Sequence, residues 1–213
     1  MIKAVIFDLD GVILSTDEFH YRAWKAIADE EGIEFDRKIN DKLRGVSRMQ
    51  SLEIILEKAT RKYDDDEKQK LAQTKNEHYR KLLAELKESA VSDDVRYTLK
   101  TLKERGYRIA IGSSSKNAKF ILERVGLIGE FDAVSDGNCI TKSKPDPEVF
   151  VVAADMLGLS AEECIVVEDS VAGIVAAKTG GFTSVAIGDA SINASADYNV
   201  NKLSDLLDIC KKN

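Results

Sequence analysis

Five short runs of apolar residues, rich in Val and Ile, constrain the fold of this chain more than any other feature. They cover residues 4–7, 108–112, 131–134, 164–167 and 183–187. Runs of this length and composition are typical of strands buried on both faces of a sheet. Helical patterns lie between the later runs, and strand followed by helix, repeated, predicts a parallel α/β sheet with right-handed crossovers.

The helices between these strands are expected to end at glycines, which are frequent just past a helix C-terminus. The three pairs of helix and closing glycine are 118–125 with Gly126, 147–157 with Gly158, and 171–178 with Gly180.

The interval between the first two runs breaks this rhythm. About 100 residues separate Phe7 from Arg108, where a single crossover helix needs far fewer. Apolar residues at helical spacing continue through the interval, over 18–31, 49–60, 66–87 and 93–105. We therefore expect an inserted helical cap over residues 16–92, and a core formed by residues 1–15 and 93–213.

Composition excludes several classes of protein. The chain has 213 residues, 32% of them charged and 44% hydrophobic, which suits one globular core enlarged by an insertion. Its net charge of −6 argues against binding to nucleic acid. We identify no signal peptide, and no uncharged apolar stretch approaches the roughly 18 residues of a membrane helix. The odd set Cys139, Cys164 and Cys210 lacks metal-ligand spacing, so we expect a cytoplasmic protein.

Polar side chains directly follow three of the predicted strands. Asp8 and Asp10 follow the first, Ser113–Asn117 follows the second, and Glu168 and Asp169 follow the fourth. Because the carboxyl ends of parallel strands share one edge, where open α/β sheets bind ligands, we expect these groups to converge. Crowded carboxylates need a cation, and oxygen ligands without His or Cys favour Mg²⁺, which commonly bridges to a substrate phosphate.

Taken together, these features resemble the haloacid dehalogenase superfamily over the whole chain. The resemblance rests on the Asp8-x-Asp10 pair after an N-terminal strand, Gly11, the serine-rich strand end, Lys144-Pro145 and Glu168-Asp169. It implies a Rossmann-like parallel sheet with an inserted helical cap. In that superfamily, an Asp two residues beyond the nucleophile marks phosphatases and phosphomutases, so Asp10 implies phosphoryl transfer.

Further stretches resemble the beta-phosphoglucomutase family, whose members interconvert beta-glucose 1-phosphate and glucose 6-phosphate. The most discriminating is Gly45-Val46-Ser47-Arg48, in the cap. This resemblance implies a phosphomutase of the isomerase class, with one Mg²⁺ per site and glucose 1,6-bisphosphate as intermediate and activator. It also implies sugar phosphates as partners and a monomeric protein. The other matching stretches are 7–13, 16, 18, 20–25, 43–44, 51–52, 75–76, 115–117, 143–145 and 168–174.

The resemblance assigns the chemical step to the core. Asp8 is the expected nucleophile, which forms an aspartyl-phosphate, and Asp10 is the expected acid and base at the sugar oxygen. Ser113, or alternatively Ser114, would hold the transferring phosphoryl group together with Lys144. The expected metal ligands are Asp8, the main-chain carbonyl of Asp10, Glu168 and Asp169.

Substrate binding is expected mainly in the cap and at the start of the helix after the second strand. Arg48 would bind the second phosphate with Ser115, Lys116 and Asn117. Arg44 stands where Lys is as readily expected, and its forked guanidinium changes the contact geometry. The remaining expected substrate contacts are Thr16, His20, Trp24, Gly45, Val46, Ser47, Ser51, Lys75 and Ser114.

Other readings of the same residues stay open at this point. Asp10 also suits a turn before Gly11, and Trp24 also suits packing inside the cap. A sugar-phosphate phosphatase of the same superfamily would share every core residue, but would not require Arg48 and Lys75. A non-catalytic regulator that binds phosphosugars would be expected to have lost one of the two aspartates.

Overall fold

The computed structural model describes residues 1–43 and 46–211, and the chain divides into two compact units. The core unit consists of Met1–Ser15 and Lys87–Asn213, and the helical unit consists of Thr16–Leu86. Arg44 and Gly45, both expected to bind substrate, lie outside the described residues. Within the described ranges, no helix is long and apolar enough to cross a membrane.

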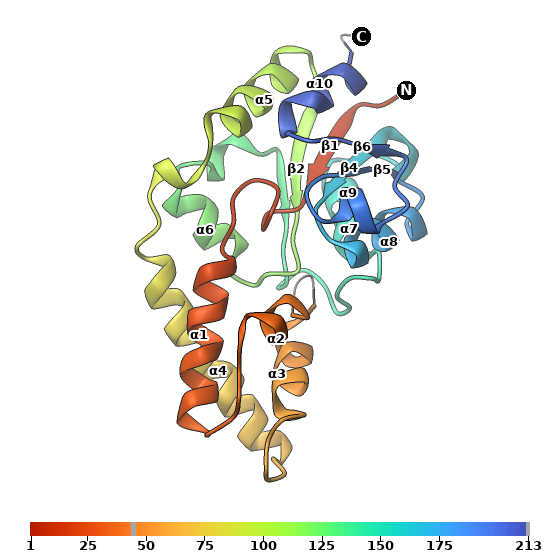
Figure 1. The fold of residues 1–213 in the computed structure, drawn as a ribbon. Helices are drawn as coiled ribbons and strands as arrows, with labels where there is room; N and C mark the ends of the chain where they lie inside the picture. The colour runs from red at the N-terminus through yellow and green to blue at the C-terminus, as the bar shows by residue number, and fades with distance from the viewer. Residues whose placement is uncertain (44–45, 212–213) are drawn as a thin grey trace. The chain divides into compact units, whose positions relative to one another are not determined.

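The core unit is built on a parallel sheet, as predicted (Figure 1). Its strand order across the described residues is β3-β2-β1-β4-β5-β6, so the order changes direction between β1 and β4. Ligands of open α/β sheets bind beyond the carboxyl ends of strands at such a point. The strands are β1 (Ala4–Phe7), β2 (Arg108–Gly112), β3 (Ala133–Ser135), β4 (Cys164–Glu168), β5 (Thr183–Ala186) and β6 (Tyr198–Asn199).

Four helices cover the two faces of this sheet. Helices α5 (Asp93–Glu104) and α6 (Ala118–Arg124) lie on one face, and α7 (Glu148–Met156) and α8 (Val171–Thr179) lie on the other (Figure 1). The split follows from right-handed crossovers, because the connections lead away from β1 in opposite directions along the sheet. The shorter helices are η1 (Glu88–Ala90), η2 (Ile128–Glu130), η3 (Ala161–Glu163), α9 (Ala190–Asn193), η4 (Leu203–Asp205) and α10 (Leu206–Ile209).

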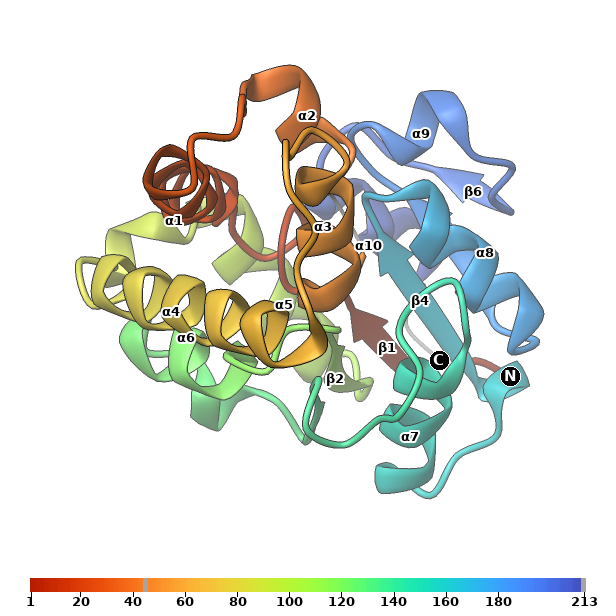
Figure 2. The same cartoon turned by 90° about the horizontal axis from the view of Figure 1, so that it is seen from below.

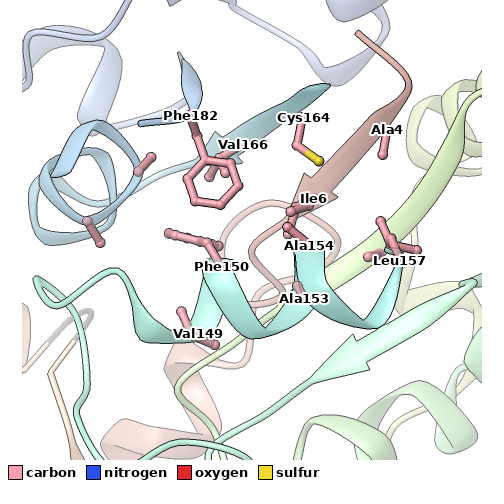
Figure 3. Packing of buried hydrophobic residues seen from close by; sticks show 13 residues of the cluster. Ala4, Ile6, Val149, Phe150, Ala153, Ala154, Leu157, Cys164, Val166 and Phe182 are labelled. Atoms are coloured by element: carbon pink, nitrogen blue, oxygen red, sulfur yellow. The ribbon is translucent and has the colours of Figure 1, made fainter. Parts of the chain in front are cut away.

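Helix α7 anchors one half of the core. Its Phe150 and Ala153 are fully buried and belong to one cluster with Ile6 of β1 and Val166 of β4 (Figure 3). Phe182, just before β5, packs edge-on against Phe150, with ring centroids 6.2 Å apart. The N-terminal end of α7 is therefore fixed to the two central strands, which matters for the loop that precedes it.

The helical unit contains α1 (Asp17–Glu30), α2 (Arg37–Asp41), α3 (Arg48–Leu56) and α4 (Asp65–Leu83) (Figure 2). Helices α1 and α4 pack side by side. Ser47 and Asp64 begin α3 and α4 with capping boxes, in which each side chain accepts a backbone N–H of the first turn. The buried cluster of this unit includes Trp24, Ile27, Leu52 and Ile55.

Several predicted boundaries are wrong in detail. The helices expected over 49–60 and 66–87 end at Leu56 and Leu83. The strand expected over 131–134 begins at Ala133, because the Asp132 carboxylate accepts the Ile109 N–H in place of a backbone carbonyl. By contrast, α8 ends as predicted, with Gly180 as its C-cap, and the next residue, Gly181, has a positive φ of 81°.

Candidate active site

Two carboxylates meet at the carboxyl edge of the central strands in the core unit. Phe7 of β1 is paired with Val167 of β4, and the N–H of Asp8 donates to the Val167 carbonyl at 2.9 Å. This register brings Asp8 next to Glu168, the last residue of β4. The two residues are only 6% and 1% exposed. The strand-end pattern thus brings together side chains that lie 160 positions apart in the sequence.

Lys144 supplies a positive charge between these carboxylates. Its Nζ donates to Oδ1 of Asp8 at 2.5 Å and to Oε1 of Glu168 at 2.6 Å. The side chain is 2% exposed, and its ammonium lies 4.7 Å from the centroid of the Phe150 ring. A buried ammonium in this position is a counterion for both acids, and removing it would leave them buried without a partner.

Asp169 adds a third acid to the group. Oxygen atoms of Asp8, Glu168 and Asp169 all lie within 4.8 Å of one another, which is close enough for a shared metal ion. The half-buried Asp10 is outside this set. Gly11 makes the close approach possible, because a Cβ on it would lie 2.0 Å from Oδ2 of Asp169 and its φ is +87°.

Glu168 is held at both of its carboxylate oxygens. While Oε1 accepts from Lys144, Oε2 accepts from the N–H of Ser170 at 2.6 Å and from its hydroxyl at 2.9 Å. Ser170 also caps α8 by accepting the Gly173 N–H at 3.1 Å. A Cβ on Gly173 would lie 1.9 Å from Oε1 of Glu168, so the first turn of α8 packs directly on this carboxylate.

The acids outnumber the cation, and their pKa values reflect this. Burial, with the neighbouring charges of Glu168 and Asp10, raises the pKa of Asp8 to about 7 although Lys144 opposes the rise. Burial, with Glu168, Asp8 and Asp10, raises the pKa of Asp169 to about 8. Burial would lower the pKa of Lys144, but Asp8 and Glu168 raise it above its usual value. The group is short of positive charge, which a divalent cation would supply.

Without a divalent cation, the protein should lose stability as the pH rises from about 4 to about 8. Both aspartate pKa values lie above the unfolded value of about 4, so the folded protein holds more protons than the unfolded chain across this range. The free energy of unfolding therefore falls with rising pH. Asp169→Asn removes one buried charge and should raise this free energy at pH 8 by about 1 to 3 kcal/mol.

Urea unfolding in EDTA, at pH 5 and pH 8, measures both effects. Asp155→Asn, an exposed change on α7, is the matched control and should behave as the original chain does. Equal pH slopes for the original chain and Asp169→Asn would show that Asp169 ionises normally in the folded protein.

The loop after β2 is ordered by its own serines. The N–H of Ser115 donates to Oγ of Ser113, and the N–H of Asn117 donates to Oγ of Ser115, both at 3.2 Å. Ser113 and Asn117 are buried, whereas Lys116 is exposed. The hydroxyl of Ser114 is buried, and no described residue gives it a hydrogen bond. This loop therefore offers both hydroxyl groups and a cation at the same edge of the sheet.

A second polar group lies in the helical unit, between α1 and α4. Nζ of Lys75 lies 2.9 Å from Nδ1 of His20, and because an ammonium only donates, Nδ1 accepts and Nε2 carries the imidazole proton. Lys75 is 2% exposed and lies over the rings of Trp24 (4.8 Å) and Tyr79 (4.4 Å). Burial, followed by the charges of Lys75 and Arg48, lowers the pKa of His20 well below its usual value, so the ring is neutral at pH 7.

The other candidates of the helical unit lie around this group. Nη2 of Arg48 donates to Oδ1 of Asn76 at 2.9 Å and joins α3 to α4. Thr16, the residue before α1, is buried and accepts a 2.9 Å hydrogen bond from the hydroxyl of Tyr79. Of the remaining candidates, Ser51 is buried, Val46 is half-buried, Ser47 caps α3 and Trp24 is buried in the cluster of the unit.

Two residues that support these groups, Tyr79 and Gly173, were not predicted from the sequence. Tyr79 lies four positions after Lys75, a spacing that puts both side chains on one face of α4, and its ring lies 4.1 Å from that of His20. Gly173 lies in the first turn of α8, where a poor helix former calls for a packing reason. Helical spacing and a misplaced glycine were the signals that could have identified them.

Comparison with known proteins identifies the family to which this chain belongs. The pattern of the haloacid dehalogenase-like hydrolases matches residues 2–181, so the chain belongs to the haloacid dehalogenase-like hydrolase family. Within it, the chain is 43% identical over 207 residues to the beta-phosphoglucomutase of Bacillus subtilis, which covers 96% of this chain and 92% of that protein. This level of identity places the chain with the beta-phosphoglucomutases, which are phosphomutases.

Solved structures agree with that placement. The crystal structure of a beta-phosphoglucomutase from Clostridium difficile matches with a TM-score of 0.90 and 36% identity, over 97% of this chain and 93% of that one. A fructose-1-phosphate phosphatase from Escherichia coli is 30% identical, over 85% of this chain and 94% of that protein. Phosphatases are thus relatives as well, and the site residues must distinguish the two activities.

Proposed function

We propose that this chain interconverts beta-D-glucose 1-phosphate and glucose 6-phosphate, with glucose 1,6-bisphosphate as intermediate and activator. The observation that carries the proposal is that each unit has a charged group of its own. Lys144 serves the core unit, and Arg48 and Lys75 are cations of the helical unit. A bisphosphate needs cations for two phosphates, whereas hydrolysis of one phosphate ester does not. The 43% identity to a beta-phosphoglucomutase supports the same function.

Asp8 is the proposed nucleophile. An oxygen of its carboxylate bonds to phosphorus while the bond from phosphorus to the sugar oxygen breaks, which leaves an aspartyl-phosphate. Lys144 holds Oδ1 of Asp8 and thereby fixes the direction of the carboxylate. Lys144 also favours the ionised form of Asp8 against the effect of burial, and ionisation is required for attack.

Asp10 is the proposed general acid and base. The departing sugar oxygen takes a proton from Asp10, and in the opposite direction Asp10 removes the proton from the attacking sugar hydroxyl. Asp10 follows Asp8 by two positions, so it lies at the same strand end but outside the three acids that could share a metal ion. Asp10 also acts electrostatically on Asp8 and Asp169, which raises the pKa of both, so its own charge belongs to the same acidic group.

The two phosphates are assigned to different residues. Ser113 and Lys144 are proposed to hold the transferring phosphoryl group, by hydroxyl and by charge, with Ser114 as the alternative hydroxyl. Arg48 is proposed to bind the distal phosphate, and a guanidinium can make two parallel hydrogen bonds to it. Ser115, Lys116 and Asn117, in the loop after β2, are proposed phosphate-binding residues of the core unit.

The acids of the core unit fit a magnesium ion. They are hard oxygen donors with no His or Cys among them, and the raised pKa values of Asp8 and Asp169 indicate a missing positive charge. Asp8 and Asp169 would hold one ion, with Glu168 and the main-chain carbonyl of Asp10 as further ligands. When bound, Mg²⁺ neutralises charge on the phosphoryl oxygens.

Residues of the helical unit are proposed to select the sugar. His20 carries its imidazole proton on Nε2, and Lys75 keeps the ring in that tautomer. Trp24 packs against Lys75, since its ring is buried and its centroid lies 4.8 Å from the ammonium. Thr16 contributes at the start of α1. The remaining proposed contacts are Arg44, Gly45, Val46, Ser47 and Ser51.

We propose that the two units have different functions, catalysis and substrate recognition. Residues 1–15 and 93–213 form the catalytic core, and 16–92 form the cap that recognises substrate; the compact helical unit of Thr16–Leu86 supports this division. Three free cysteines are consistent with the cytoplasm as the proposed location. We also propose that the protein is a monomer.

A product assay tests the proposed function. Beta-glucose 1-phosphate is incubated with the protein, Mg²⁺ and a trace of glucose 1,6-bisphosphate, and glucose 6-phosphate and free phosphate are measured together. The proposal predicts glucose 6-phosphate as the main product, no turnover in EDTA, and recovery when Mg²⁺ is added in excess. Free phosphate as the main product would identify a sugar-phosphate phosphatase.

Arg48→Ala should impair the mutase reaction much more than transfer of phosphate from a small donor. Losing a charge-assisted hydrogen bond costs about 1.5 to 3 kcal/mol, so we expect use of the bisphosphate to weaken roughly ten- to a hundredfold. Hydrolysis of acetyl phosphate needs no distal contact and should stay near the original rate. Arg61→Ala, an exposed change in the same unit, serves as control.

The comparison of the two rates decides the role of Arg48. Equal losses in both reactions would place Arg48 in the structure of the helical unit or in the chemical step. No loss in either would remove the distal phosphate from this residue.

A further inference from the structure

The loop that carries Lys144 has to hold the Lys144 ammonium at a well-defined position between Asp8 and Glu168. Lys144 lies between β3 and α7, in a segment without helix or strand, and its neighbours Lys142 and Pro145 are exposed. Its Nζ nevertheless lies 2.5 and 2.6 Å from two buried carboxylates. Something must fix the backbone on both sides of Lys144, because a solvated loop alone samples many conformations.

Glu148 fixes the part of the loop before Lys144. The N–H of Thr141 donates to both of its carboxylate oxygens, at 3.1 and 3.0 Å, and the Thr141 hydroxyl is at 3.2 and 3.1 Å. The N–H of Lys142 donates to Oε2 at 2.6 Å. Hydrogen bonds from Lys142 and Thr141 lower the pKa of Glu148, so the carboxylate is ionised at pH 7 and accepts all of them.

Glu148 is itself tied to the sheet. It is the first residue of α7, and the next two residues, Val149 and Phe150, are fully buried against the central strands. The part of the loop after Lys144 is closed by the Glu148 N–H, which donates to Oδ1 of Asp146 at 3.1 Å, and by the Asp146 N–H, which donates to the Ser143 carbonyl at 3.1 Å. The loop segments before and after Lys144 are thus both hydrogen-bonded to the N-terminal end of α7.

We propose that Glu148 is a positioning residue for Lys144: its carboxylate holds the backbone of Thr141 and Lys142 so that the ammonium reaches Asp8 and Glu168. Glu148 does not contact the substrate. The inference rests on the proposed function, because it takes Lys144 as the residue that holds Asp8 and the transferring phosphoryl group.

A double-mutant cycle tests this coupling. Glu148→Ala should lower kcat of the mutase reaction by about ten- to a hundredfold, since small displacements of a catalytic group have effects of that size, and leave KM within about twofold. In a Lys144→Ala background, the same change should lower the rate less than about twofold, because the group it positions is gone. Glu148→Gln keeps one acceptor oxygen, so its kcat should lie between those of the original chain and Glu148→Ala. Glu162→Ala, an exposed glutamate in η3, is the matched control.

Chemical labelling reads the position of Lys144 without turnover. Buried Lys144 should react slowly with acetic anhydride, and peptide mass spectrometry should show it reacting several-fold faster in Glu148→Ala. The exposed Lys119 of α6, which lies outside this loop, provides an internal reference that should not change. This measurement decides the matter even where the Lys144→Ala rate is too slow to follow.

The outcomes separate the two proposals. Equal losses from Glu148→Ala in both backgrounds, or unchanged labelling of Lys144, would overturn the positioning role while leaving the proposed function standing. Full mutase activity of Lys144→Ala would instead overturn the assignment of Lys144, whatever Glu148 does.

Discussion

Replacing Asp8 with Asn should lower the mutase rate by about 10⁴-fold or more, which is the scale seen when a nucleophile is removed from an active site. The amide has nearly the same shape, but it cannot supply the negatively charged oxygen that attacks phosphorus. Lys144 keeps its bond to Glu168, so the fold of the core unit should persist. The rate is measured as formation of glucose 6-phosphate, and intact mass spectrometry checks for the phosphorylated protein after exposure to acetyl phosphate.

The control for this change is Asp155→Asn, which alters an exposed aspartate of α7 and should leave the rate unchanged. The mass of the Asp8→Asn peptide also excludes reversion to aspartate by deamidation. A folded Asp8→Asn protein that turns over, or that still gains a phosphoryl group, would remove Asp8 from the mechanism.

Replacing Asp10 with Ala should slow the reaction by about 10² to 10⁴-fold, the range that general acid–base catalysis contributes. Phosphoryl transfer from acetyl phosphate should suffer less, because its leaving group needs little help from an acid. The pH profile of the remaining activity should also lose the limb that belongs to the acid. Rates with both donors, across pH 5 to 9, measure these effects.

Metal binding separates Asp10 from the neighbouring acids. Asp10 is proposed to offer only its main-chain carbonyl, so titration calorimetry should find Mg²⁺ affinity little changed in Asp10→Ala. Asp169→Asn, by contrast, should weaken it strongly, because Asp169 belongs to the group of acids that could share an ion. Loss of affinity in Asp10→Ala would mean that its side chain is a ligand.

The central strands β1 and β4 were predictable because they are buried on both faces of the sheet. Their apolar runs stand out from the charged helices around them, as at Ala4–Phe7 and Cys164–Glu168. The elements that escaped prediction lack such a signal. Strand β6 has two exposed residues, Tyr198 and Asn199, and α2 is too short at five residues to show a helical repeat.

The approach of Asp8 and Glu168 could be predicted for a topological reason. Parallel strands must end at one edge, so Asp8 and Glu168 had to approach each other once β1 and β4 were neighbours. The position of Lys144 could not be predicted in this way, because the sequence of a loop does not determine where its side chains lie. Its place depends on hydrogen bonds such as those of Glu148, which join residues whose contact no periodicity reveals.

The contact between His20 and Lys75 in the helical unit was harder to predict from the sequence. His20 and Lys75 are 55 positions apart and meet only because α1 packs along α4. Sequence spacing aligns residues within one helix, but does not give the relative rotation of two helices. Tyr79 shows the limit clearly, since its spacing from Lys75 was visible while its bond to Thr16 was not.

The fate of the phosphoryl group on Asp8 tests the central claim most directly. The protein is phosphorylated with radiolabelled acetyl phosphate, freed of excess donor, and mixed with beta-glucose 1-phosphate and Mg²⁺ in a single turnover. The proposed mutase should pass most of the label to glucose 1,6-bisphosphate and glucose 6-phosphate, with free phosphate as a minor product. Release of the label mainly as free phosphate, at the same rate with and without the sugar phosphate, would contradict it.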